Sequence, residues 1–306
     1  MLDLGLHVFV LLVLPPFLLG VICKTKAWFA GRSGPPLLQA YYDVAKLLRK
    51  GAVYSRTTTW VFRAGPIITL AAIICAGLVV PLTTARAPLG FAGDVILFAY
   101  LLGLGRFFTM AAALDTGSSF EGMGASREAA FSALAEPALF LALAIVCVPV
   151  RRFMLGEAFS ALPWPSWGPA HPAFIAASGT LFAVLLAENS RIPVDDPATH
   201  LELTMVHEVM LLDHSGPDLA FIMYGGAIKL FVIGALLVHL LLPVPVERDW
   251  HGAALLVGGE LGIAVAIGVI ESVTARLRLP RVPQFLIGAS ILAAVGLAMT
   301  FYVGKP

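Results

Sequence analysis

Long apolar runs separated by shorter polar connections dominate the chain. A membrane-spanning helix needs about 20 mainly apolar residues. Eight segments reach or approach that length, at about 4–23, 61–82, 92–114, 129–150, 172–187, 218–242, 251–271 and 283–303, and the fifth is short. Because a backbone in lipid must satisfy its own hydrogen bonds, each segment is predicted to be a helix. The pattern therefore predicts a single all-α transmembrane domain over residues 1–306, with about eight spans and no internal repeat.

Composition supports the same class. The chain is 59% hydrophobic and 13% charged, whereas ordinary soluble domains carry about 25% charged residues. A net charge of +1 gives no reason to expect a nucleic-acid partner. The three cysteines, Cys23, Cys75 and Cys147, form no CxxC pair. The sequence therefore predicts no zinc, nickel or iron–sulfur site in this chain.

Basic residues predict the orientation of the spans. If the first connection is cytoplasmic, 13 of the 20 lysine and arginine residues fall on the cytoplasmic side and 5 on the other side, while Arg106 and Lys229 lie within spans. The positive-inside rule then predicts a multi-pass protein of the cytoplasmic membrane with both termini on the non-cytoplasmic side. The run Leu4–Cys23 lacks a basic region before it and is interpreted as a retained first span.

Two large cytoplasmic connections, about 24–60 and 188–217, are predicted to carry structure and to dock a soluble partner. Trp28 and Phe29 among basic residues suit a short interfacial helix, and a second helix is predicted over Tyr41–Lys50. A membrane-surface anchor without further function remains an alternative for this connection. The residues assigned to docking are Arg32, Gln39, Asp43, Lys46, Arg191 and Asp196.

The second connection begins with AENSRIPVDDPATHLELTMVHE, residues 187–208, and holds five carboxylates. Acids at the edge of a hydrocarbon region are costly, so they usually face protein, water or a partner. Asp196 precedes Pro197, which favours a helix start there and a helix to about Leu212. Whether Asp196 is only a helix cap is left open.

The stretches GRSGPPLLQAYYDVAKLLRKG (31–51) and AENSRIPVDDPATHLELTMVHE (187–208) resemble the membrane subunit shared by respiratory complex I and energy-converting nickel–iron hydrogenases. The second stretch is closer to the formate hydrogenlyase and hydrogenase-4 branch than to complex I. The resemblance implies an eight-helix subunit between a soluble redox arm and antiporter-like membrane subunits. It places the nickel–iron centre and iron–sulfur clusters in partner chains. The quinone chamber of complex I remains an open alternative for this chain.

The same resemblance implies that four acids belong to a proton pathway: Glu136, Glu188, Glu202 and Glu208. Proton conduction needs ionisable groups linked by water. Six residues on one helix would separate Glu202 and Glu208 by about 120°, which makes Glu202 the better inward candidate. Asp195 is assigned to the same pathway. Glu121 and Glu128, before the fourth span, are left open between loop solvation and function.

Three charges lie within spans: Arg106, Lys229 and Glu260. A lone charge there costs at least about 2.5 kcal/mol, so we predict that Lys229 and Glu260 form, or are bridged into, one buried ionic network, which is either structural or part of the proton pathway. Arg106 is assigned to the same pathway and is the next candidate partner for Glu260. His200, His207 and His214 recur every seven residues, about 10.5 Å apart on a helix, which is too far for neighbours to share a metal.

The sequence therefore predicts a membrane-arm subunit that docks a soluble hydrogenase arm and couples its electron transfer to proton or sodium translocation, without a redox site of its own. A quinone-site subunit of a complex I-type dehydrogenase and a stand-alone ion transporter are the alternatives. A passive membrane anchor is the fourth interpretation, and it leaves Glu136 and the charges within spans unexplained.

Overall fold

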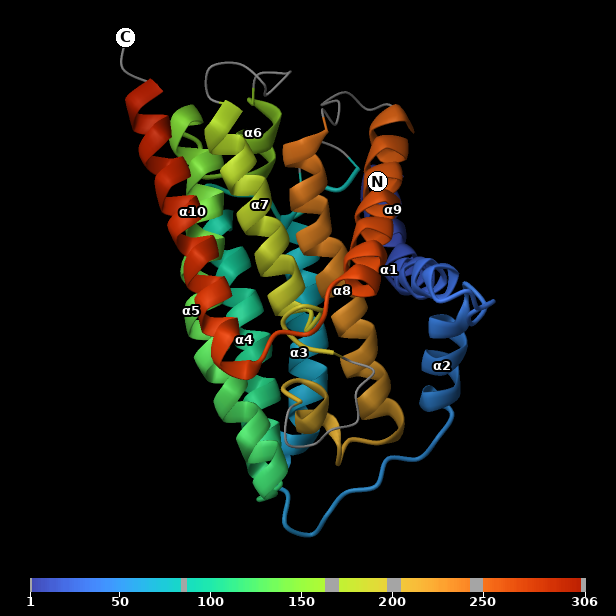
Figure 1. The fold of residues 1–306 in the computed structure, drawn as a ribbon. Helices are drawn as coiled ribbons and strands as arrows, with labels where there is room; N and C mark the ends of the chain where they lie inside the picture. The colour runs from blue at the N-terminus through green and yellow to red at the C-terminus, as the bar shows by residue number, and fades with distance from the viewer. Residues whose placement is uncertain (1, 84–86, 163–170, 197–204, 243–249, 304–306) are drawn as a thin grey trace.

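The protein is a bundle of long helices (Figure 1) in a computed structural model that describes residues 2–83, 87–162, 171–196, 205–242 and 250–303. In chain order the helices are α1 (Leu2–Phe29), α2 (Gln39–Leu48), α3 (Trp60–Val79), α4 (Asp94–Asp115), α5 (Ser119–Val150), α6 (Leu155–Ser160), α7 (His171–Glu188), the 3-10 turn η1 (Glu208–Leu211), α8 (Gly216–Leu241), α9 (Trp250–Val273), the 3-10 turn η2 (Leu279–Arg281) and α10 (Val282–Val303).

The predicted all-α membrane fold is confirmed. Within the described ranges, seven helices are long and apolar enough to cross a membrane, and Pro172–Glu188 is a shorter apolar helix. These eight helices match the eight predicted spans, including the short fifth one. The chain is therefore a multi-pass membrane protein.

Helix α8 occupies the centre of the bundle. It packs against α1, α2, α3, α7 and α9, while α10 packs on α5 and α7. From Ala227 to Val238 every residue of α8 is buried. A helix that is apolar on all sides is stable only when other helices surround it, so any charge on α8 must be accommodated inside the protein.

Helix α5 is longer than predicted. It begins at Ser119 rather than near residue 129 and contains 32 residues, which corresponds to a length of about 48 Å. The hydrocarbon core of a bilayer is about 30 Å thick, so the first turns of α5 extend beyond it. The acids Glu121 and Glu128 therefore lie on a helix and not in a loop.

Two local predictions are wrong. Trp28 and Phe29 do not form a separate interfacial helix, because α1 continues through them; the predicted second helix is α2. The helix predicted from Asp196 to Leu212 is also wrong in its described part, where only η1 is helical. The carboxylate of Asp195 accepts hydrogen bonds from the backbone N–H groups of Val206 and His207, which replaces helical bonding at this point.

The connection between α2 and α3 lies at one end of the bundle, with η1 in the same half and the segment after α7 nearer mid-height (Figure 1). Asp115 at the end of α4 stabilises this end by accepting hydrogen bonds from the backbone N–H groups of Thr59 and Phe62. Gly216 has φ +56°, and an added Cβ there would lie 2.6 Å from the carbonyl oxygen of Gly51. The two large connections are therefore held in contact with each other.

Candidate functional site

Four charged side chains from four helices meet inside the bundle, and we call them the buried ion network. Arg106 of α4 contacts Glu136 of α5 at 2.7 Å and Glu188 at the end of α7 at 3.3 Å. The other carboxylate oxygen of Glu188 lies 3.7 Å from Nζ of Lys229 in α8. Two cations thus face two carboxylates. Charges removed from water are tolerated when they are paired in this way.

The members of the network differ in access to the surface. The side chains of Arg106 and Glu188 are 6% and 3% exposed, whereas that of Glu136 is 44% exposed. Glu136 therefore lies at the rim and Glu188 at the interior of the network. Glu188 is also the residue that joins both cations, so it holds α4, α7 and α8 together.

Asp195 organises the segment that follows α7. One of its carboxylate oxygens lies 2.7 Å from Arg276, beyond the end of α9. Its other oxygen accepts the hydrogen bonds from Val206 and His207 described above. Three separate parts of the chain therefore converge on one buried carboxylate, seven residues after Glu188.

A second buried acid, Glu271 near the end of α9, was not singled out from the sequence. Its carboxylate oxygens lie 2.8 Å from Lys26 of α1 and 3.5 Å from Arg191. The available signal was its position at the last residue of a predicted span, where an acid must find a cation or water. Arg191 is thus paired within the chain, although the sequence assigned it to docking.

Two small cavities with charged residues in their lining lie next to the buried ion network. The first, of about 30 Å³, is lined by Arg106, Lys229, His207 and Glu128 among others. The second, of about 10 Å³, is lined by Glu188, Asp195, Ser132 and Glu128 among others. Volumes of this size match single water molecules. Glu128, which the sequence leaves open between loop solvation and function, lines both cavities.

The histidine at the first cavity is held neutral. Burial and the neighbouring charge of Lys229 lower the pKa of His207 to about 3. Burial also lowers the pKa of His214 to about 4, and its ring stacks on Phe62 at 4.1 Å. Neutral imidazoles can exchange hydrogen bonds with water without adding charge to the site.

The predicted pair between Lys229 and Glu260 is wrong. Lys229 contacts Glu188, while Glu260 is buried against Gly234 of α8, and its Oε1 has no hydrogen-bond partner among the described residues. Lys229 and Gly234 are five residues apart, which turns them about 140° from each other around α8. Arg106 does not pair with Glu260 either, because it contacts Glu136 and Glu188.

The contact between Glu260 and Gly234 gives a testable prediction. A Cβ at position 234 would lie 2.7 Å from one carboxylate oxygen of Glu260. Gly234→Ala should therefore destabilise the protein by about 1–3 kcal/mol, as overpacking of a core does. Thermal unfolding of the detergent-solubilised complex measures this. Adding Glu260→Ala should restore most of the loss; equal losses in the single and double variants would show that the crowding lies elsewhere.

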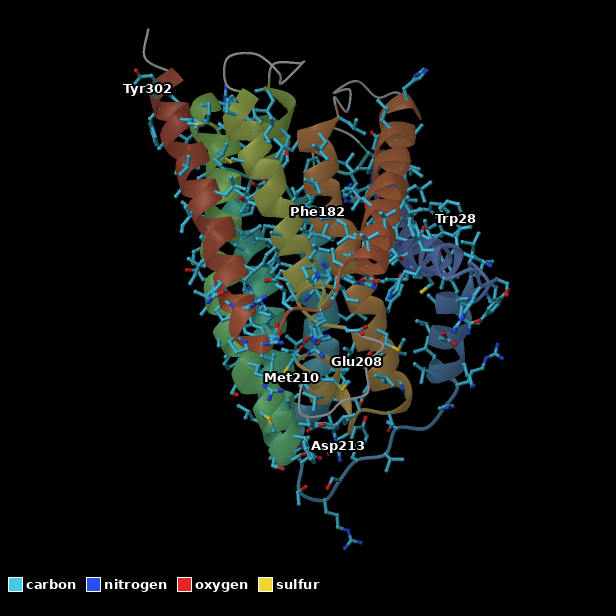
Figure 2. The ribbon with its side chains drawn as sticks, viewed as in Figure 1. Trp28, Phe182, Glu208, Met210, Asp213 and Tyr302 are labelled. Atoms are coloured by element: carbon cyan, nitrogen blue, oxygen red, sulfur yellow. The ribbon has the colours of Figure 1, made fainter. Side chains whose placement is uncertain are left out.

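Two predicted pathway acids remain, Glu202 and Glu208. Glu202 lies outside the described residues. Glu208 begins η1 and, with Met210 and Asp213, lies at the lower centre of the bundle between α5 and α8 (Figure 2). In the predicted docking set, Arg32 and Lys46 are exposed, and Gln39 donates a hydrogen bond to Asp43 within α2. Asp196 follows the buried Asp195 and is half-buried.

Comparison with known proteins identifies the family. The family model described as NADH dehydrogenase matches residues 3–303. The chain belongs to this family. It is 30% identical to formate hydrogenlyase subunit 4 of Escherichia coli (strain K12), over 94% of this chain and 95% of that protein. It is 32% identical to hydrogenase-4 component C of the same organism, over 81% of this chain and 77% of the relative.

Two further similarities are more distant. A subunit of the NADH-quinone oxidoreductase of Anaplasma phagocytophilum (strain HZ) is 26% identical over 72% of this chain and 69% of its own length. A chain in the structure of the membrane-bound sulfane sulfur reductase, an archaeal respiratory membrane complex, superposes with a TM-score of 0.83 over 98% of both chains at 22% identity. The latter supports the fold.

The charged groups gathered in the site of this NADH dehydrogenase family member are carboxylates, lysine and arginine. Within the described ranges, no group of three or more His, Cys, Asp or Glu side chains is arranged to hold a metal ion. Cys23, Cys75 and Cys147 are free thiols. The described arrangement places ionisable side chains beside cavities of the size of a water molecule.

Proposed function

We propose that this chain is the membrane-arm subunit of a hydrogenase-type complex, and that it couples electron transfer in a soluble redox arm to proton translocation. The observation that carries the proposal is the buried ion network beside two water-sized cavities. Balanced buried charges next to water are the elements of a proton pathway in membrane proteins. The relatives in formate hydrogenlyase and hydrogenase-4 support the hydrogenase-type partner.

The proposed coupling passes through the segment after α7. Glu188 holds two cations of the network, and only a few residues later Arg191 and Asp195 hold Glu271 and Arg276. A soluble arm that moved this segment would change the distances between Glu188, Arg106 and Lys229. Because charge separation changes the proton affinity of a carboxylate, such a movement would drive proton uptake or release.

The proposal extends to location and partners. The chain would lie in the cytoplasmic membrane with both termini outside the cytoplasm, in contact with antiporter-like membrane subunits. Nickel–iron and iron–sulfur groups would reside in the soluble partners. Protons are favoured over sodium because Arg106 and Lys229 already balance the two network carboxylates.

A second candidate is the quinone-site subunit of a complex I-type dehydrogenase, which the relative from an NADH-quinone oxidoreductase favours. The two cavities beside the network measure about 30 and 10 Å³ and are smaller than a quinone ring. Mass spectrometry of the gently solubilised complex separates the candidates. A nickel–iron subunit supports the first candidate, and a flavin- and nucleotide-binding module without nickel supports the second.

The docking part of the proposal predicts a loss of the soluble arm when exposed cations are reversed. Arg32→Glu with Lys46→Glu should weaken copurification of soluble subunits by about tenfold or more, because like charges across an interface are repulsive. Affinity purification through this chain measures the ratio. Arg152→Glu, in an exposed pair after α5, is the matched control. An unchanged ratio in the double variant, with loops 24–60 and 188–217 forming no cross-link to soluble subunits, would reject the docking assignment.

A further inference from the structure

Glu128 lines both of the small cavities beside the buried ion network. Among the described residues that line them, it is the one shared by both. It lies in the N-terminal part of α5, eight residues before Glu136, which separates the two acids by about 12 Å along the helix. A glutamate has three rotatable side-chain bonds, so a carboxyl at this junction can turn toward either cavity.

Two positive and two negative side chains surround Glu128, and the two signs line different cavities. The first cavity presents Arg106 and Lys229, with the neutral His207 beside them. The second cavity presents Glu188 and Asp195. All four charges act on the carboxyl of Glu128. The carboxyl of Glu128 therefore binds a proton more readily when it faces the carboxylates than when it faces the cations. This difference favours proton transfer from the second cavity to the first.

Glu128 also differs from Glu188, Glu136 and Asp195 in its freedom to reorient. Glu188 is fixed by two cations, Glu136 by Arg106, and Asp195 by Arg276 and two backbone N–H groups. No ion pair is recorded between Glu128 and the described residues. A group that must change both its protonation and its orientation needs this freedom, because a fixed pair holds a carboxylate charged.

We infer that Glu128 is the residue that transfers the proton between the two cavities. The ionised carboxyl takes the excess proton of a protonated water in the cavity of Glu188 and Asp195, which leaves a neutral water there. The neutral carboxyl then turns and gives the proton to a water in the cavity of Arg106, Lys229 and His207, which restores the carboxylate. One O–H bond forms and one breaks at each step, and no redox partner is required. This inference rests on the proposed function and names a residue that the family resemblance did not supply.

The test compares Glu128→Gln with Glu128→Asp in the intact complex reconstituted in vesicles, with proton uptake and electron transfer measured together. Glutamine keeps the size but cannot carry the proton, so protons moved per electron should fall by about tenfold or more. Aspartate keeps the carboxyl but is one methylene shorter, so it should pump more slowly with a larger solvent deuterium isotope effect. Glu157→Gln, an exposed acid of α6, is the matched control and should behave as the wild type.

The outcomes separate this inference from the proposed function. Loss of pumping in Glu128→Gln with partial recovery in Glu128→Asp supports it. Normal pumping in Glu128→Gln together with failure in Glu188→Gln overturns the role of Glu128 and leaves the proposed function intact. Normal pumping in both overturns the proposed function as well. If Glu128→Gln does not assemble, an unchanged isotope effect and rate in Glu128→Asp overturn the inference.

Discussion

Replacing Glu188 by glutamine should reduce proton translocation by about tenfold or more per electron transferred, while most of the complex still assembles. Glu188 joins Arg106 and Lys229 through its two carboxylate oxygens. Glutamine keeps the size and can still accept a hydrogen bond, but it cannot carry a charge through a protonation cycle. Arg106 retains Glu136 at 2.7 Å, which preserves part of the packing between α4 and α5.

The measurement is proton uptake by vesicles that contain the whole complex, divided by electrons transferred. Glu188→Asp restores the charge and should recover part of the activity. Glu136→Gln should have a smaller effect, because its side chain is 44% exposed and water can replace part of its role. A normal ratio in both glutamine variants would remove these acids from the pathway and with them the basis of the proposed function.

The fold could be predicted from the sequence because lipid leaves few alternatives. An apolar run of about 20 residues must be a helix, and the runs were long enough to count. The structure of the polar segments was harder to predict. The start of α5 at Ser119 was missed because Glu121, Arg127 and Glu128 give its first turns the composition of a loop. The segment before η1 was wrongly predicted to be helical. The carboxylate of Asp195, 11 and 12 residues earlier in the chain, accepts the hydrogen bonds of the backbone N–H groups of Val206 and His207.

The members of the site could be found, but not their pairing. Glu136 and Glu188 were selected through the family resemblance, and Arg106 and Lys229 because charges within apolar spans are costly. The structure brings these four together. Sequence gives neither the rotation of a helix about its axis nor the order of helices in the bundle. For this reason Lys229 was assigned to Glu260 on the next helix, when it faces α7 instead. The importance of Glu128 was missed for the related reason that its two cavities are formed by residues of α3, α4, α5, α8, the end of α7 with the segment after it, and the segment around η1.

Replacing Arg106 by methionine should destabilise the protein by about 3–5 kcal/mol, since removal of one partner leaves buried charge uncompensated. Arg106 is 6% exposed and is shared by two carboxylates. After its removal Glu136 loses its 2.7 Å contact, and Glu188 keeps only Lys229 at 3.7 Å. Methionine has a similar length and good helix propensity, so the change removes the charge with little cost in packing.

Thermal and denaturant unfolding of the solubilised complex, followed by a probe on this chain, measures the loss. Arg106→Met leaves the two carboxylates of the network with Lys229 as its one cation. Adding Glu188→Gln removes this excess negative charge, so the double variant should be more stable than Arg106→Met alone. The cycle isolates the coupling because the two residues contact each other directly. Strictly additive losses would mean that Arg106 and Glu188 act independently, and the network would then be a set of separate pairs without the shared charge that the proposed proton pathway needs.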